Sequence, residues 1–488
     1  MAPEISSKQP AFYRIPVEIL TEISRSVLNE DKPRETLKAL RLSCPQFAYL
    51  DNIQKFLFHS IRLETTPEEL ERLETYDISR LSPFIKRITF ITPKHSWIIT
   101  FNVFFQILCV QPSYPPEYED GGTMEQGFEA YMARANQIKT LFDSGRFENA
   151  CIAIFEKLSG PVDVAISTLS SEDWGEISTT RVVYDLYAHS HSNDEEDPHN
   201  ESDCMAAAAV VGDALFLAIT AALSAATRKP KVVLRIECVL SGDVAWMHKP
   251  KWAGIDLDGL GGVIFEPRFS NADEDDPDEP EAVYTVDRVP ENSMMLLSSI
   301  LEKCQHTLTT LHIHPIEPSG EHVDIIWPPP DRAVVALPKL EELYINHAVF
   351  RAKDFATFLL RATNLKSLNL ESTDLEPEYR THDPDYSQYK YIWTAIRRHQ
   401  SRMQLDFYEI IGNDWSEISD SFHSGGDPPP SRCHDEDDWR LDLRGYVSGT
   451  NGWTKKLRWY FDGEDIDNDD MDEISDDEGS NFDEMDID

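Results

Sequence analysis

The feature that most constrains the fold is a short strand pattern that recurs along the chain, in most cases after an apolar helical segment. Its fullest form, Leu-x-x-Leu followed by an alternate Leu or Ile, stands at residues 308–313, 340–345 and 365–370. Alternate apolar positions indicate strands with one buried face. No single unit can bury that face alone, so we expect neighbouring units to stack around a shared core. Shorter forms of the pattern stand at residues 85–90, 164–166, 234–236 and 405–407.

The Leu-x-x-Leu-x-Leu form resembles the leucine-rich repeat. That resemblance implies a ladder of parallel strands on a concave side and helices on a convex side. The units are closely spaced near residues 340–370, but long insertions separate the earlier ones. A mixed α/β domain without a true solenoid therefore stays open as the alternative. For residues 64–423 we predict an α+β or α/β repeat fold, an irregular leucine-rich-repeat-like αβ solenoid with acidic and proline-rich loop insertions.

A second constraint lies at residues 12–63, which contain three short apolar helical patterns. In the first pattern, Ile15, Ile19, Ile23 and Val27 recur at every fourth position, which places them on one face of a helix. Three helices of this length can bury only a small shared core. Too many apolar side chains remain for a free-standing module, so we expect the segment to dock on a partner or on the next domain.

The same segment resembles the F-box. It carries Ile-Pro-x-Glu-Ile-Leu from Ile15, Leu-Arg-Leu-x-Cys from Leu40, Phe-x-x-Leu from Phe47 and Leu-Phe-x-x-Ile-x-Leu from Leu57. The resemblance implies a trihelical domain that binds the Skp-type adaptor of cullin–RING ubiquitin ligases and, through it, a cullin scaffold. By matching position, the adaptor-binding or core residues are Ile15, Pro16, Ile19, Leu20, Leu40, Cys44, Phe47, Leu50, Leu57 and Phe58. The alternative is a three-helix cap, which would bury Leu20, Leu50 and Leu57 against residues 64–110 instead of exposing them.

The formal net charge of -42 is concentrated in three segments. Residues 194–203, 273–281 and 462–488 carry six, seven and fifteen acidic residues without a Lys or Arg, which leaves about 14 negative charges for the rest. The last segment is predicted to be a disordered acidic tail. A net-negative chain without a basic cluster is a poor nucleic-acid binder, so no nucleic-acid partner is predicted.

Cysteine spacing and apolar runs indicate a soluble protein of a reducing compartment. The seven cysteines include no Cys-x-x-Cys pair, which argues against a zinc ribbon or a redox dithiol. Residues 204–227 are apolar enough to suggest a membrane span, but they are rich in alanine, contain Asp213 and lead directly into a strand pattern. We therefore predict a buried helix there, with no membrane partner. A signal pattern is lacking, and the predicted localisation is cytoplasmic and/or nuclear.

Motifs for catalysis are sparse. His312 and His314 alternate with Leu311 and Ile313 on one predicted strand, so they are interpreted as surface residues rather than metal ligands. Residues 259–262 lack the spacing of a phosphate-binding loop and indicate a turn. We predict no catalytic residue, no metal site, no cofactor and no enzymatic activity.

These patterns predict a substrate-recognition subunit of an SCF-type cullin–RING ubiquitin ligase. The F-box-like unit would hold the adaptor, and the concave strand face would hold a protein substrate and raise its effective concentration. Residues 424–461 are predicted to form a linker and two C-terminal strands. The alternatives are a repeat scaffold with a vestigial F-box and an acidic chaperone of basic proteins. The candidate substrate-binding residues are Thr310, His312, Glu342, Tyr344, Ser367 and Asn369.

Overall fold

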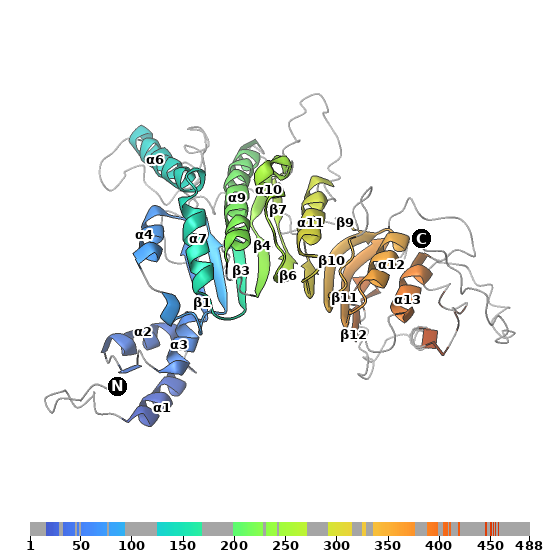
Figure 1. Cartoon of the computed structure of the whole chain (residues 1–488), viewed down its shortest axis with the longest axis horizontal. Coiled ribbons are helices and arrows are strands. Elements are labelled where there is room, and N and C mark those ends of the chain that lie inside the picture. The colour runs from blue at the N-terminus through green and yellow to red at the C-terminus, as the bar shows by residue number, and fades with distance from the viewer. Residues whose placement is uncertain are drawn as a thin grey trace.

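The computed structural model is an α+β chain built on one large, mostly parallel sheet (Figure 1). Within the described residues there are 11 α-helices and 14 β-strands. The predicted acidic tail and most of the predicted segment 424–461 lie outside them. The structure describes residues 16–28, 33–43, 46–47, 50–75, 78–92, 124–167, 199–227, 231–241, 244–270, 291–314, 325–327, 335–375, 388–398, 404–407, 409–410, 418–419, 445–446, 449–450, 452, 454 and 457.

Three helices at the N-terminal end form a unit with a hydrophobic core of its own. They are α1 (Val17–Val27), α2 (Pro33–Ser43) and α3 (Asp51–Phe58). The apolar spacing predicted three helices here, and the structure has three. The predicted unit 12–63 nevertheless ends inside the sheet, because Ser60 already begins the first strand. The core of the three-helix unit consists of Leu20, Val27, Leu37, Phe47, Leu50, Ile53 and Leu57.

The sheet adds its strands in the order of the sequence. Each main strand pairs in parallel with the next one along the chain, and only the short strands β13 (Glu409–Ile410) and β14 (Ile418–Ser419) pair antiparallel. Strand β9 (Ile325–Trp327) pairs with β10, and β5 (Val239–Ser241) with β7 (Arg268–Ser270) forms a separate two-stranded sheet. The main strands are β1 (Ser60–Glu64), β2 (Arg87–Ile91), β3 (Val162–Ser167), β4 (Val232–Glu237), β6 (Leu260–Phe265), β8 (Thr310–Ile313), β10 (Glu342–Phe350), β11 (Ser367–Leu375) and β12 (Gln404–Phe407).

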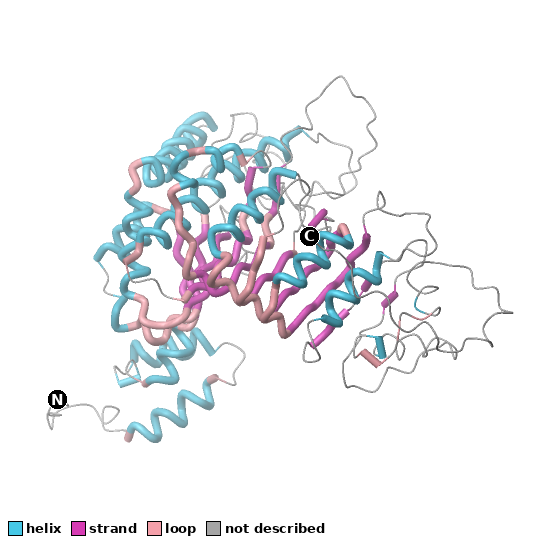
Figure 2. Tube along the Cα trace, turned by 45° about the vertical axis from the view of Figure 1, so that its right-hand side comes forward, coloured by secondary structure: helices cyan, strands magenta, loops and turns pink. Residues whose placement is uncertain are grey.

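Helices cover one face of this sheet (Figure 1 and Figure 2). Parallel strands added in one direction by crossovers of one hand place every connecting helix on the same side. We call the opposite side the open face. The helices after the three-helix unit are α4 (Pro67–Thr75), α6 (Met124–Asp143), α7 (Arg146–Lys157), α9 (His199–Ala225), α10 (Pro250–Ala253), α11 (Glu291–Cys304), α12 (Ala352–Arg361) and α13 (Gln388–Arg398).

The core lies between the sheet and its helices, and the strand register aligns the predicted apolar positions. The central apolar residue of each strand pattern pairs with the central residue of the next strand. All of these side chains are buried, with at most 1% of their surface exposed. The apolar positions predicted from the sequence are therefore confirmed for these strands except β6, for which no strand pattern was predicted and whose residues are all buried. The aligned residues are Ile88, Val164, Leu234, Val263, Leu311, Leu343 and Leu368.

Helix α9 is the most apolar helix described, and within it Ala206–Ala225 is long and apolar enough to cross a membrane by length and composition. About two thirds of that stretch (67%) is buried inside the protein. Its one carboxylate, Asp213, accepts hydrogen bonds from the backbone N–H and the hydroxyl of Ser241 on β5. The packing confirms the predicted buried helix.

Strand β6 begins with glycines because its neighbours leave no room for side chains. Gly259 has a φ of 116°, which favours glycine, and the register against β4 shifts at the next residues. A Cβ on Gly261 would lie 2.7 Å from Lys231 Cε, and one on Gly262 would lie 3.2 Å from both methyl groups of Val233. The turn predicted at residues 259–262 is therefore right for Gly259 and wrong for the rest, which form a bulged strand.

Part of the C-terminal region packs on the last described helix. The hydroxyl groups of Tyr446 and Thr394 of α13 lie 2.7 Å apart, and the guanidinium of Arg397 stacks over the Tyr446 ring at 5.0 Å. Tyr446 and Leu457 are both buried in the main core. Apart from Leu457, the predicted strands at residues 439–443 and 457–461 lie outside the described residues.

Candidate functional site

The predicted substrate-binding residues come together on the open face of three adjacent strands. Thr310, Glu342 and Ser367 pair across β8, β10 and β11 and form one row. The next row along the strands consists of His312, Tyr344 and Asn369. All six alternate with leucine and isoleucine side chains that are buried on the helix side. The sequence pattern thus placed these residues on one surface.

Contacts within this surface link the two rows. Nε2 of His312 lies 3.1 Å from a carboxylate oxygen of Glu342, and the His312 and Tyr344 ring centroids are 5.5 Å apart. The side chains of His312 and Glu342 are 28% and 50% exposed, so the pair is accessible to a partner. Because a carboxylate can only accept, Nε2 of His312 is the donor.

Two further residues of this face were not among the predicted substrate-binding residues, although His314 was predicted to lie at the surface. His314 follows Ile313 on β8, and Asn346 follows Ile345 on β10. Their side chains contact each other, with Asn346 Nδ2 3.3 Å from His314 Nε2. Asn346 is only 4% exposed. The same alternation that identified His312 and Tyr344 continues to these two positions and would have found them.

An ion-pair network extends the open face toward the N-terminal strands. Arg87 of β2 reaches across β3 to Glu237 at 3.4 Å. Arg235 lies 3.2 Å from Glu237 and 3.1 Å from Glu266, which directly follows β6. Burial raises the pKa of Glu237 above its usual value, although Arg235 and Arg87 act in the opposite direction. Arg87 and Arg235 stand between the apolar residues of two shorter strand patterns, and Glu237 directly follows the second, so the alternation was the available signal.

The three-helix unit places the predicted adaptor-binding residues in two environments. Leu20, Phe47, Leu50 and Leu57 are buried in the core of the unit, while Leu40 and Phe58 are half-buried against it. Pro16 and Ile19 are exposed. Leu20, Leu50 and Leu57 are therefore buried, and among the described residues their core cluster consists of residues of the three-helix unit alone. Ile15 and Cys44 lie outside the described residues.

Among the described side chains of this unit, three large apolar ones are exposed, one on each helix. They are Ile19 of α1, Leu42 of α2 and Phe56 of α3, with 51%, 89% and 41% of their surface exposed. Each described helix of the unit thus presents one large apolar side chain to solvent. Of these three, only Ile19 was predicted from the sequence as an adaptor-binding residue. Leu42 stands inside the quoted Leu-Arg-Leu-x-Cys motif, so its exposure could have been weighed there.

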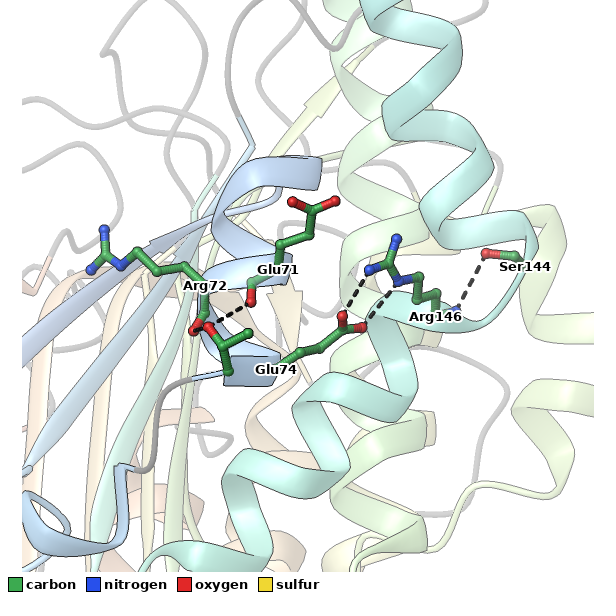
Figure 3. A network of polar contacts seen from close by, with 6 residues as sticks. Glu71, Arg72, Glu74, Ser144 and Arg146 are labelled. Atoms are coloured by element: carbon green, nitrogen blue, oxygen red, sulfur yellow. Dashed lines mark hydrogen bonds and ion pairs between the residues drawn. The ribbon is translucent and has the colours of Figure 1, made fainter.

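Helix α4 follows β1, the first strand after the three-helix unit, and is held to the next helices by arginine–glutamate pairs. Arg146 of α7 donates two hydrogen bonds to Glu74, at 3.0 and 2.7 Å (Figure 3). Arg134 of α6 binds Glu68 through both of its terminal nitrogens. The hydrogen bonds from Arg146 lower the pKa of Glu74. The start of α4 is capped, since the Glu69 N–H donates to the Thr66 hydroxyl at 3.2 Å.

Among the residues that the structure describes, no group of three or more His, Cys, Asp or Glu side chains could hold a metal ion. Cys151, Cys238 and Cys304 are free and buried. Burial raises the pKa of Cys304 to about 12 and that of Cys151 well above its ordinary value. Thiols with such pKa values stay protonated and are poor nucleophiles at neutral pH.

Sequence comparison finds no matching protein-family model and no significantly similar curated protein. The function must therefore be argued from the two surfaces themselves, the open face and the three-helix unit.

Proposed function

We propose that the protein is the substrate-recognition subunit of an SCF-type cullin–RING ubiquitin ligase. In this proposal the three-helix unit is an F-box that binds a Skp-type adaptor, and the adaptor connects it to a cullin. The observation that carries the proposal is a small helical unit with its own core that leaves Ile19, Leu42 and Phe56 at the surface. A cap would use such side chains to cover the sheet, whereas a docking unit keeps them for a partner.

We further propose that the body is an irregular leucine-rich-repeat-like solenoid. Its support is the strand order, which follows the sequence, and the alignment of Leu311, Leu343 and Leu368 in one register row. Helices on a single side leave the open face as a continuous surface, which corresponds to the concave face of such a solenoid. The residues on that surface are polar, charged and aromatic, as suits recognition of a protein.

The junction between the two parts suits this function because it has no spare length. Helix α3 ends at Phe58, His59 follows, and β1 starts at Ser60. The carbonyl of His59 accepts hydrogen bonds from the backbone N–H groups of Lys86 and Arg87, at 2.9 and 3.0 Å. A docked adaptor is thereby held in a defined position relative to the open face. The receptor acts by positioning a substrate lysine and forms no bond itself.

Co-purification of the full chain with a Skp-type adaptor tests the proposal. We expect one-to-one binding by the wild type and loss of binding in Ile19→Asp and Leu42→Asp, because a carboxylate cannot be buried in an apolar interface without a partner. Both side chains are already exposed, so the substitutions leave the core of the unit intact. Leu57→Asp is unsuitable, since Leu57 is buried and its replacement would unfold the helices.

Val210 of α9 provides the matched control. It is an exposed apolar residue (64%) outside the three-helix unit, so Val210→Asp should bind the adaptor as the wild type does. A soluble, folded wild type that fails to bind the adaptor would overturn the proposal and leave the scaffold as the better account.

A further inference from the structure

Two buried oxygen atoms on the open face lack hydrogen-bond partners. Oδ1 of Asn346 on β10 and Oδ1 of Asn369 on β11 are both buried, and neither accepts a hydrogen bond. The Asn346 amide nitrogen contacts His314 Nε2 and can only donate, so the orientation of this amide leaves its oxygen without a donor. Burying a carbonyl oxygen without a donor is unfavourable, so two on neighbouring strands require an explanation.

The strand register places these oxygens close together. Tyr344 pairs with Asn369, and Asn346 pairs with the following open-face position of β11, so the two asparagines are diagonal neighbours. The Glu342 carboxylate stands on the same strand as Asn346, in the row before Tyr344. Tyr344 stands between Glu342 and Asn346 along β10 and pairs directly with Asn369. This part of the face thus combines two carbonyl oxygens, a carboxylate and an aromatic ring.

Such a combination suits a ligand that donates several hydrogen bonds and carries positive charge. The oxygens of Asn346, Asn369 and Glu342 all accept, and the aromatic face of Tyr344 attracts a cation. The net charge of -42 on the whole chain also draws cationic partners toward it. An anionic ligand would meet the Glu342 carboxylate and two carbonyl dipoles of the wrong sign.

We propose that this part of the open face binds an arginine side chain of a partner protein. If the proposed function holds, that partner is the substrate, and its specificity then includes an exposed arginine. A guanidinium has five donors in one plane and stacks on aromatic rings, so it can serve both amide oxygens and the carboxylate together. A lysine ammonium has only three donors around one atom and satisfies fewer of these separated acceptors. Binding moves aside the atoms that now bury the two oxygens, as side chains at interfaces commonly do.

Fluorescence anisotropy with short labelled peptides tests the proposal on the full-length protein. Three peptides share a glycine–serine background and differ in carrying arginine, lysine or glutamine at one central pair of positions. We expect the arginine peptide to bind more tightly than the lysine peptide by about tenfold, the value of one charge-assisted hydrogen bond. The glutamine peptide should bind weakest, because it lacks the charge.

Variants separate this site from general attraction to the acidic segments. Asn369→Leu and Asn346→Leu each remove one acceptor and should abolish most of the preference for arginine over lysine. Asn346→Asp keeps the acceptor, adds charge and should strengthen arginine binding. Asp163→Asn is the control: it removes an exposed negative charge from β3 on the same face and should leave the arginine preference unchanged.

Equal affinity for the arginine and lysine peptides in the wild type would overturn the proposal. So would an arginine preference that survives in the folded Asn369→Leu variant, because Asn369 is half-buried and its replacement is tolerable. The first result would mean that no arginine site exists on this face, and the second that arginine binds at a site that does not include Asn369. Adaptor binding uses the three-helix unit and is measured separately, so failure of the arginine site and failure of the proposed function give different results.

Discussion

Glu237 shows how burial changes the pKa of a single residue on the open face. Its carboxylate contacts Arg87 and Arg235, yet its pKa is raised because removal from water outweighs these two contacts. The folded state therefore holds the Glu237 proton more tightly than the unfolded chain does. For such a group, stability falls as the pH rises through the folded-state pKa, and it recovers as the pH is lowered again.

The substitution Glu237→Gln tests this sign. Glutamine keeps the shape of the protonated acid, so the variant should be slightly more stable than the wild type at neutral pH, by under about 1 kcal/mol. The difference should shrink when urea unfolding is repeated at intervals from neutral pH down toward the ordinary glutamate pKa of 4.5. Asp163→Asn on the same face is the matched control. A difference that grows at the lower pH would show that the arginine contacts dominate instead.

At the scale of the element, the local sequence pattern predicted where the strands lie. It did not predict the contacts between residues of strands that are far apart in the sequence. The alternation in residues 308–313, 340–345 and 365–370 identified β8, β10 and β11 and the side that each residue faces. The Arg87–Glu237 pair depends on the register of β2, β3 and β4, which long insertions separate in the sequence. No local signal specifies that register. The end of the three-helix unit was misplaced because the apolar pattern continues from α3 into β1 without a break.

Helix α4 offers a test of how firmly one element is fixed. A double-mutant cycle reverses the charges of Arg134 and Glu68, first singly and then together. Each single reversal should destabilise the protein. The double variant should recover a coupling free energy of about 0.5 kcal/mol, as expected for a partly exposed pair. Urea unfolding gives the coupling, and amide exchange within α4 shows whether that helix loosens first. The Lys139–Asp143 pair lies entirely within α6, so reversing its charges should leave exchange in α4 unchanged. Unchanged exchange in α4 for the Arg134 variant would show that packing of Leu70 fixes the helix instead.

The whole molecule joins two parts that perform different tasks. The three-helix unit keeps its own core, and the sheet with its helices keeps another, so each part has its own source of stability. The link between them is the single residue His59, which both follows α3 and accepts two backbone hydrogen bonds from the sheet. Such a link transmits orientation, since no flexible segment stands between the adaptor-facing helices and the open face.

A flexible glycine–serine spacer inserted between Phe58 and His59 tests this rigid coupling. Both cores and the His59 hydrogen bonds stay intact, so unfolding by urea and binding of the adaptor should match the wild type. The distance between fluorescent labels on α1 and on α12 should change from a narrow distribution to a broad one in single-molecule measurements, because the spacer behaves as a random coil. The same spacer placed within residues 273–281 should leave the distribution narrow. A narrow distribution with the spacer after Phe58 would mean that contacts other than the junction hold the three-helix unit. The orientation of a docked adaptor would then be set by the surface of that unit and not by His59.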